Sequence, residues 1–293
     1  MLFRSRLTDE ALIKDKLYAK PGVAHRDMAY SLAFSPDGTL LASGSYREIK
    51  LWRRASGGQK STIADAAKKS VQLIVASDDG KWLATADENA IKLWDVASAK
   101  PGKTLTGHTN AVTSLKFSPD STKLLSGSTD KSAKIWSLAD ASVFAEIATP
   151  SEVNAVAWVS AGKQIATGGA DNLIRLWKVP DAAKGALAAG KELKGHSKAV
   201  TALDAVAPEG AQLVSGSADG IVRIWTVDSA AAGKQITHGT PVTAVAVRPD
   251  GKVIASLGVT NTSVKLWTLA DGKAAGEVKG DRVVLEKAAV AER

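Results

Sequence analysis

Two groups of residues contain the Ser, His and Asp types that a nucleophilic hydrolase uses. The first consists of His108, Ser126 and Asp130, with Trp136 six residues after the Asp. The second repeats these types and the Ser–Asp–Trp spacing: His196, Ser215, Asp219 and Trp225. In a catalytic triad the His takes the proton of the Ser, and the Asp orients the imidazole. A hydrolase also needs a substrate pocket and oxyanion donors. The sequence assigns neither to these groups, so it favours a structural role for them.

The four histidines follow a repeat instead of interrupting one. Each lies seven residues before an equivalent strand residue, in the pairs His25–Leu32, His108–Leu115, His196–Leu203 and His238–Val245. They fall in different copies of the repeat, and no close His, Asp or Glu ligand spacing occurs. The chain has no Cys, which excludes cysteine-ligated zinc, iron–sulfur clusters and thiol nucleophiles. We therefore expect no metal and no cofactor.

A short string ending in Trp returns six times and reveals the repeat. The copies are IKLW (49–52), IKLW (91–94), AKIW (133–136), IRLW (174–177), VRIW (222–225) and VKLW (264–267). Successive tryptophans are 42, 42, 41, 48 and 42 residues apart, and the longest interval contains an insert at 180–190 that reads as an enlarged loop. Six tryptophans at one repeat position are interpreted as core residues, in preference to a ligand cage or a stacking platform.

Each period contains short runs in which apolar and polar residues alternate, as in half-buried strands. In the third copy these are VTSLKF (112–117), TKLLS (122–126) and SAKIW (132–136), followed by a weaker strand at 143–147. Turn formers such as SPDG (35–38) and RPDG (248–251) separate the first two strands. Gly-rich pieces such as SGS (126–128) are interpreted as backbone punctuation. Four strands in about 42 residues predict one small antiparallel sheet.

Such a sheet cannot bury both faces alone, so successive copies must stack, and radial closure leaves few exposed edges. The predicted fold is therefore all-β, a β-propeller with six four-stranded blades. The six blades either close directly or form part of a seven-bladed ring. We place the blades at 25–64, 66–107, 108–148, 149–195, 196–237 and 238–280.

The repeat resembles the WD-repeat (WD40-type) family. The resemblance rests on GH at 107–108 and 195–196, each followed by a Trp-ended strand, and on WD at 94–95. It implies that His, Ser or Thr, Asp and Trp of one blade form an internal hydrogen-bonded tetrad. Complete tetrads are expected in the third and fifth copies. They are His108, Ser126, Asp130 and Trp136, and His196, Ser215, Asp219 and Trp225.

The other copies depart from the tetrad pattern. The fourth has Thr149 where His is expected, which predicts a weaker blade. The first copy has a shortened turn without the Asp. The second copy has a similarly shortened turn, and the sequence leaves open whether Asp87 takes the place of the Asp there. The sixth has Asn261 in a turn that is longer by one residue.

Both ends of the chain differ from the repeat. Residues 1–24 form an N-terminal segment that is interpreted as partly non-native or a remnant strand, and 281–293 reads as the start of a truncated helix beginning at Asp281. The chain is therefore expected to be a fragment. Residues 25–54 resemble the WD-repeat part of bacterial, planctomycete-type proteins that also carry a c-type cytochrome domain. That kinship implies an exported or periplasmic parent; otherwise the cytoplasm is the default compartment.

Charge and hydropathy exclude few partner classes. The net charge is +8, with the Lys residues spread along the chain, so nucleic acid is not required. No apolar run reaches the roughly 18 residues that a membrane span needs. We expect a monomeric ring.

Once the repeat residues are assigned to packing, function is expected on the loops. By the family resemblance, the partner-binding face carries the loops before the first strand and between the second and third strands. The candidates there are Arg26, Asp27, Tyr46, Arg47, Asp87, Glu88, Asn110, Thr129, Lys131, Glu152, Asn172, Lys198, Thr260 and Asn261. Tyr46 and Arg47 are the best individual candidates, because Tyr and Arg are enriched at binding hot spots.

The opposite rim gathers basic residues: Arg53, Arg54, Lys60, Lys100, Lys103, Lys184, Lys191, Lys234 and Lys273. They suggest polyanion or nucleic-acid binding, or else lysines that prevent edge-to-edge aggregation, which we favour. The sequence thus predicts a non-catalytic scaffold for protein–protein or inter-domain contacts through the loop face. The alternatives are polyanion binding by the basic rim and a hydrolase or lyase site in the central channel.

Overall fold

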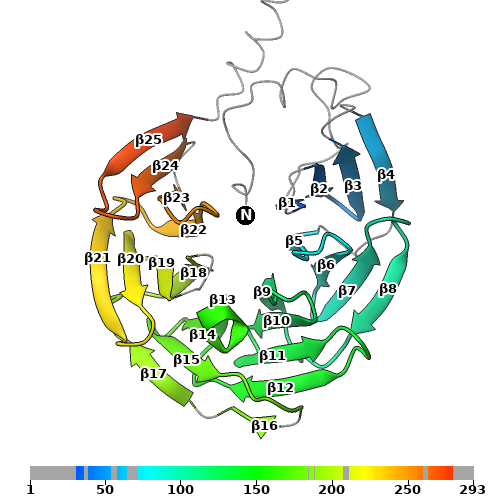
Figure 1. Ribbon diagram of the computed structural model, residues 1–293, viewed down its shortest axis with the longest axis horizontal. Coiled ribbons are helices and arrows are strands. Elements are labelled where there is room, and N and C mark those ends of the chain that lie inside the picture. The colour runs from blue at the N-terminus through cyan, green and yellow to red at the C-terminus, as the bar shows by residue number, and fades with distance from the viewer. Residues whose placement is uncertain are drawn as a thin grey trace, which may run out of the picture.

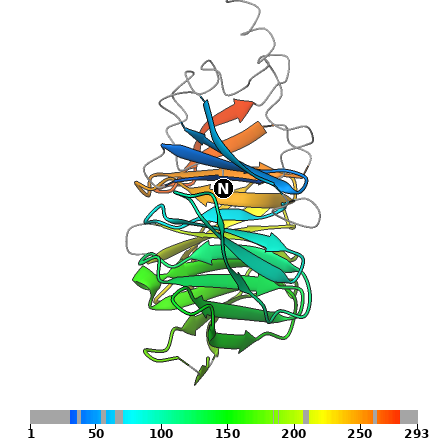
Figure 2. The ribbon, with the colours of Figure 1, turned by 90° about the vertical axis from the view of Figure 1, so that its right-hand side faces the viewer.

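The computed structural model describes residues 31–35, 39–53, 58–64, 71–183, 185–187, 189–206, 211–259 and 263–279. They form six sheets around a central axis (Figure 1), so the predicted six-bladed all-β propeller is confirmed. Seen from its side, the ring is a flattened disc (Figure 2). The N-terminal segment 1–24, His25, Arg26, Asp27, Thr260, Asn261 and the helix expected at 281–293 lie outside the described residues.

The blades follow one another in chain order, and strand neighbours within each are antiparallel. Blade 1 contains β1 (Ser31–Phe34), β2 (Leu40–Gly44), β3 (Glu48–Arg53) and β4 (Gly58–Ala64). Blade 2 contains β5 (Ile74–Ala76), β6 (Trp82–Asp87), β7 (Ala90–Asp95) and β8 (Pro101–Leu105). Blade 3 contains β9 (Val112–Phe117), β10 (Lys123–Ser128), β11 (Ser132–Ser137) and β12 (Val143–Ala148).

The remaining blades repeat this order from the axis outward. Blade 4 contains β13 (Val153–Val159), β14 (Gln164–Gly169), β15 (Ile174–Lys178) and β17 (Ala189–Leu193), with a short 3-10 helix at Ser160–Gly162. Blade 5 contains β18 (Val200–Ala205), β19 (Gln212–Ser217), β20 (Ile221–Thr226) and β21 (Ala231–Thr237). Blade 6 contains β22 (Val242–Val247), β23 (Val253–Gly258), β24 (Ser263–Thr268) and β25 (Ala274–Lys279).

The insert in the fourth repeat is more than an enlarged loop. Its short strand β16 (Gly185–Ala186) pairs in parallel with β12, with Ala145 opposite Gly185 and Glu146 opposite Ala186. Blade 3 therefore has a fifth strand supplied by the following repeat. Because β12 is otherwise an edge strand, this pairing satisfies backbone groups that would remain exposed.

The turns between first and second strands form as predicted in blades 2, 3 and 6, while most of the SPDG turn (35–38) of blade 1 lies outside the described residues. Gly80 and Gly251 end the turns of blades 2 and 6 with φ of 71° and 68°, and Ser121 takes the same conformation in blade 3 with φ 56°. The Gly80 N–H donates to Ser77 O at 3.0 Å, and the Gly251 N–H donates to Arg248 O at 2.8 Å. Positive φ is favourable for Gly, which explains its place here.

The core lies between the blades. At the junction of blades 3 and 4, Ile135 of β11 and Ile147 of β12 pack with Val153, Val156 and Trp177 of blade 4. We call the side of a blade that meets the next blade in the chain its forward face. Successive side chains of a strand point to opposite faces, so each strand contributes apolar residues both to the forward face and to the face that meets the preceding blade.

Glycines in the second strands allow this close packing, which corrects their interpretation as backbone punctuation. A Cβ added to Gly127 would lie 2.6 Å from Val153 Cγ1 of the next blade. A Cβ added to Gly168 would lie 2.6 Å from the Val200 side chain. None of these glycines needs a positive φ, so the reason is steric: a side chain would collide with the next blade.

The forward face of blade 6 differs from the others. In blade 5, Val222 and Ile224 of this face are buried, with exposed fractions of 0% and 4%. Their counterparts in blade 6, Val264 and Leu266, are only half-buried. The position of Gly127 is occupied in blade 6 by Leu257, since Leu257 stands opposite Ala244 as Gly127 stands opposite Ser114.

Candidate functional site

The blade 3 group forms a chain of hydrogen bonds inside one sheet. Trp136 on β11 donates its indole N–H to Ser126 Oγ on β10 at 2.8 Å. Ser126 Oγ lies 2.8 Å from His108 Nε2, and His108 Nδ1 lies 2.8 Å from Asp130 Oδ2. A carboxylate only accepts, so His108 donates from Nδ1 and accepts the Ser126 hydroxyl hydrogen at Nε2. In this row of four side chains, the polar hydrogens of Trp136, Ser126 and His108 therefore each have one acceptor.

Burial decides the protonation of this group. His108 is 3% exposed and Ser126 is 0% exposed. Burial lowers the pKa of His108 and outweighs the opposite effect of Asp130, so the imidazole is neutral. Burial alone would raise the pKa of Asp130, but hydrogen bonds from Ser132 and His108 hold it below its usual value. The Ser126 hydroxyl is enclosed in the sheet and already bonded to Trp136, so this arrangement offers no accessible nucleophile.

Blade 5 has the same geometry. His196 Nδ1 lies 2.9 Å from Asp219 Oδ2, and His196 Nε2 lies 2.7 Å from Ser215 Oγ. Trp225 donates to Ser215 at 2.8 Å. Burial lowers the pKa of His196 as well, because the charged imidazolium would lose its hydration. The structure thus brings together the members of both groups that the sequence singled out.

Blades 2 and 4, whose His is replaced, use the Asp differently. Asp171 forms an ion pair of 2.8 Å with Arg175. Asp87 is buried and forms an ion pair of 2.9 Å with Lys92. Asp87 therefore does not complete a tetrad, and its carboxylate is engaged within the blade. A neighbouring cation takes the place of the missing imidazole.

Blade 6 keeps only part of the network. Trp267 donates to Ser256 Oγ at 2.7 Å, but within the described part of the chain the buried His238 Nε2 has no hydrogen-bond partner. His238 Nδ1 instead lies 3.2 Å from Thr240 Oγ1. Burial lowers the pKa of His238, and the charge of Lys265 adds to this effect. Blade 6 therefore keeps the bond between Trp and Ser but lacks the bond between His and Ser.

The bond between indole and hydroxyl is present in all six blades, over distances from 2.7 to 2.9 Å. The pairs are Trp52–Ser43, Trp94–Thr85, Trp136–Ser126, Trp177–Thr167, Trp225–Ser215 and Trp267–Ser256. Five of these tryptophans are buried, and Trp267 is half-buried. They serve the interior of the blades.

A second repeated residue was missed in the sequence. Each third strand carries a cation two residues before its Trp: Lys50, Lys92, Lys134, Arg175, Arg223 and Lys265. Lys134 is 4% exposed and pairs with Glu146 on β12 at 2.5 Å, and Arg175 also reaches Glu192 on β17 at 3.2 Å. Each of the six strings that end in Trp contains this Lys or Arg, so the sequence already showed the repeated cation. We call these six residues the third-strand cations.

The loop-face candidates divide by exposure. Tyr46 is 51% exposed, and Arg47, Glu88, Asn110, Lys131, Glu152 and Lys198 are also exposed. Thr129 and Asn172 are half-buried. The tips of these turns share one conformation, with φ of 58° at Arg47, 58° at Glu88 and 64° at Lys131. The structure therefore places most of the described candidates on one accessible end of the ring.

Val259 is an exposed apolar residue that the sequence reasoning did not single out. It is 64% exposed and follows β23, as Tyr46 follows β2. Among the described residues, these two are the large hydrophobic side chains that are exposed. Alignment of the second strands would have identified this position, because Tyr46 and Val259 each stand three residues after the Ser of the second strand, Ser43 and Ser256.

The lysines of the opposite rim partly bind neighbouring blades. Lys103 of blade 2 donates to the Ala139 carbonyl oxygen of blade 3, and Lys191 of blade 4 donates to that of Asp228 in blade 5. Lys100, Lys234 and Lys273 are exposed. The side chains of Arg53, Arg54, Lys60 and Lys184 lie outside the described part. Two of the rim cations thus bind a neighbouring blade, and Lys273 forms an ion pair of 3.4 Å with Asp271 of its own blade.

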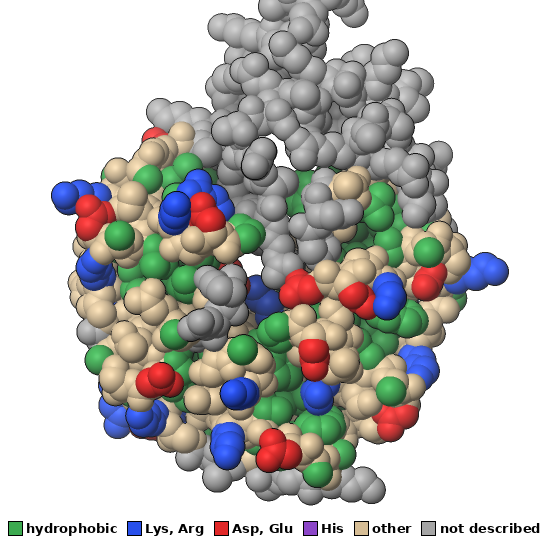
Figure 3. All heavy atoms as spheres, viewed as in Figure 1, with side chains coloured by type: hydrophobic (Ala, Val, Ile, Leu, Met, Phe, Trp, Pro, Cys, Tyr) green, Lys and Arg blue, Asp and Glu red, His purple; other side chains and the backbone are tan. Residues whose placement is uncertain are grey.

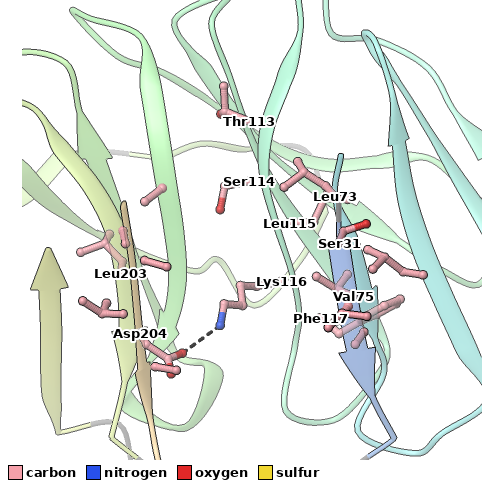
Figure 4. A pocket seen from close by; sticks show the side chains of 18 of the residues that line it. Ser31, Leu73, Val75, Thr113, Ser114, Leu115, Lys116, Phe117, Leu203 and Asp204 are labelled. Atoms are coloured by element: carbon pink, nitrogen blue, oxygen red, sulfur yellow. Dashed lines mark hydrogen bonds and ion pairs between the residues drawn. The ribbon is translucent and has the colours of Figure 1, made fainter. Parts of the chain in front are cut away.

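The ring encloses a central channel of about 450 Å³, lined by the inner strands of all six blades. Lys116 of β9 crosses it and lies 2.8 Å from Asp204 Oδ1 of β18 (Figure 4). Asp204 Oδ2 also accepts the Val247 N–H at 2.9 Å. At the same repeat position the other blades carry Ala33, Val75, Ala157 and Ala246. The ion pair joins blades 3 and 5 and neutralises both charges.

Comparison with known families identifies this architecture. The model of the WD40 family, described as WD domain, G-beta repeat, matches residues 21–53, 60–95, 99–137, 145–178, 189–226 and 233–268. The chain belongs to the WD40 family. Members of this family are generally non-catalytic and act typically as protein-interaction scaffolds.

A cyanobacterial protein shares a short part of the chain. An uncharacterized WD repeat-containing protein of Synechocystis sp. is 39% identical over 59 residues, which are 20% of this WD40 chain and 17% of that protein. Within the described residues, no group of three or more His, Asp or Glu is placed to hold a metal ion. In the same residues, no helix has the length and hydropathy to cross a membrane.

Proposed function

We propose that this WD40 propeller is a non-catalytic scaffold that binds a protein partner, or another domain of its parent chain, through the loop face. The face comprises the loops before the first strands and those between the second and third strands. Tyr46, Arg47 and Val259 form its central contact set. Asn110, Lys131 and Lys198 are further exposed members.

The observation that carries this proposal is the position of the exposed apolar side chains. Tyr46 and Val259, 51% and 64% exposed, occupy equivalent turns of blades 1 and 6. Single exposed apolar residues are common, but two at one repeat position on one end of a rigid ring favour a contact surface. The recurring Ser, His, Asp and Trp residues are engaged inside the blades and leave recognition to these loops.

Charge supports a protein partner more than a polyanion. The exposed candidates of the loop face carry both signs, since Arg47, Lys131 and Lys198 occur together with Glu88 and Glu152. On the described part of the opposite end, drawn in Figure 3, Lys and Arg side chains are also interspersed with Asp and Glu side chains. A polyanion site needs a continuous basic surface. Mixed charge with isolated apolar residues is typical of a non-obligate protein interface.

Quantitative affinity capture from a lysate of the source organism tests the proposal. Partners captured by the wild-type chain should be lost, by about tenfold or more, when Tyr46→Ala and Val259→Ser are combined, because hot-spot truncations cost about 2 kcal/mol or more. The matched control is Lys100→Ala with Lys234→Ala, which removes exposed side chains from the opposite rim. Equal loss with both variants, or no loss with the first, would contradict the chosen face.

The parent protein supplies a candidate neighbour for this face. Residues 25–54 resemble the WD-repeat part of bacterial proteins with a c-type cytochrome domain, so we propose such a domain as an intramolecular partner, in an exported protein. The chain itself contains no Cys to attach a haem. Co-expression with flanking domains and the same two pairs of variants would test an intramolecular contact.

A further inference from the structure

One third-strand cation differs from its counterparts. Arg223 on β20 of blade 5 has a buried Nε that finds no hydrogen-bond partner among the residues that the structure describes. Its guanidinium lies against the connection from blade 4, because a Cβ added to Gly195 would be 3.4 Å from Arg223 Cζ. The residue as a whole is half-buried, so it is partly accessible to solvent. A buried donor without an acceptor is costly, and such groups are rare in folded proteins.

Among the equivalent cations, Lys92, Lys134 and Arg175 have carboxylate partners from two sources. One source is the turn before the third strand, as in Asp87–Lys92 at 2.9 Å and Asp171–Arg175 at 2.8 Å. The other is a Glu opposite the cation on the fourth strand. Glu146 stands opposite Lys134 and Glu192 opposite Arg175 in the strand register, and both form ion pairs.

Both sources are missing for Arg223. Its turn carboxylate, Asp219, accepts from His196 and from the backbone N–H groups of Ser197 and Ile221. The residue opposite Arg223 on β21 is Gln235, in the place that Glu146 and Glu192 take in their blades. The loss of this Glu leaves the guanidinium without an anion among the described residues.

The surroundings of Arg223 favour a negatively charged ligand. Lys194 and Lys198, which flank Gly195 in the connection from blade 4, are both exposed. The nearest carboxylate on that connection, Glu192, is engaged by Arg175 and Lys194 at 3.2 and 3.1 Å. Gln235 is exposed, so a ligand can approach over β21.

We infer that Arg223 is a receptor for a carboxylate side chain of an acidic partner peptide. The incoming Asp or Glu occupies the place that Glu146 and Glu192 fill in blades 3 and 4. A guanidinium presents parallel N–H donors that match the two oxygens of a carboxylate, which suits it to this role better than a Lys. Lys194 and Lys198 add attraction for neighbouring acidic residues. The inference deepens the proposed function, since it supplies the chemistry of the partner at the side of blade 5.

The test uses an acetylated hexaglutamate peptide as the probe and the whole chain labelled with nitrogen-15. The Nε–H resonance of Arg223, assigned by its loss in Arg223→Gln, should shift on titration of the peptide at constant ionic strength. Inorganic phosphate should shift it less than the peptide does. An equal shift with phosphate, or no shift with the peptide, would overturn the carboxylate assignment.

The decisive variant is Gln235→Glu, which supplies an internal carboxylate as in blades 3 and 4. It should weaken peptide binding about tenfold or more, as a lost charged hydrogen bond does, and raise the melting temperature. The matched control is Gln212→Glu, which adds the same charge to β19 of the same blade and should change affinity less than about threefold. Equal effects of the two variants would sink the inference. The proposed loop face is tested separately by Tyr46 and Val259, so either idea can fail alone.

Discussion

At the residue scale, the hydroxyl of the second strand is the constant member of the network. It accepts the indole N–H in every blade, whereas His and Asp change partners or are absent. A buried indole has one polar hydrogen that needs an acceptor, and the hydroxyl supplies that acceptor in each blade. The Asp is satisfied either by an imidazole, as in Asp130, or by a cation, as in Asp171.

Removal of the indole should destabilise the ring more than removal of the imidazole. We expect Trp136→Ala to lower the free energy of unfolding by about 3–5 kcal/mol, because a large buried side chain leaves a cavity. His108→Ala should cost about 1–3 kcal/mol through unsatisfied neighbours. Urea unfolding measures both, with Thr122→Ala at an exposed position as the control. Equal stability of wild type and both variants would contradict this assignment.

Stability should decrease as the pH falls below about 6.5, the ordinary pKa of His. Burial lowers the pKa of His108, His196 and His238 in the folded state, so the unfolded chain binds more protons in this range. Their contribution is present above the unfolded pKa and is lost as the pH falls through the folded pKa. Unfolding curves at pH 7.5, 6.5 and 5.5 test this, and His196→Gln should flatten the dependence. A free energy of unfolding that increases toward acid would refute it.

At the element scale, the blades are held together by close contact between a second strand and the next first strand. Gly127, Gly168 and Gly216 leave room for Val153, Val200 and Val242 of the following blades. The same position holds Ala86 in blade 2, which is the largest side chain found there between two described, packed blades. The small residue at this position of the second strand therefore allows the next blade to pack closely against it.

A side chain at this position should disturb the junction of two blades. We expect Gly127→Val to destabilise the protein by about 1–3 kcal/mol or more, because the added methyl groups would overlap Val153. Calorimetric melting measures the effect. Gly80→Ala is a useful comparison, since no atom lies within 4 Å of a Cβ added there and only its positive φ opposes the change. A Gly127→Val protein that melts like the wild type would disprove the steric role.

At the scale of the whole molecule, blade 6 carries the exceptional second strand. Leu257 stands where other blades have Gly or Ala, and the forward face around it is half-buried. A following blade with a Val at the usual place would collide with Leu257. Five copies carry that Val, as Val71, Val112, Val153, Val200 and Val242, and the first copy carries Ala29. Ala29 lies outside the described residues, and its repeat position is read from the sequence alone.

The side chain at position 257 is larger than its counterparts, and the side chain at position 29 is smaller. If the sixth copy packs against the first, we expect these two positions to be energetically coupled. Leu257→Gly and Ala29→Val should each destabilise the chain, one by a cavity and the other by overpacking. The double variant restores the Gly–Val combination that four of the five other junctions have, so it should be more stable than the sum of the single effects predicts, by about 1 kcal/mol or more. A double-mutant cycle of urea unfolding measures the coupling. Strictly additive effects would argue against a direct junction.

The sequence alone determined the number of blades and the type and order of their four strands, because each copy repeats its apolar alternation, its turns and its Trp. The resemblance to the WD-repeat family also implied that His108, Ser126, Asp130 and Trp136 form one group, and the repeat showed that a second copy contains the same residue types. The extra strand β16, the glycine contacts between blades and the pairing of Lys116 with Asp204 were decided by tertiary structure. These contacts join different copies, and the spacing within one copy carries no information about them. The same holds for Arg223, because only the strand register shows that Gln235, and not a Glu, stands opposite it.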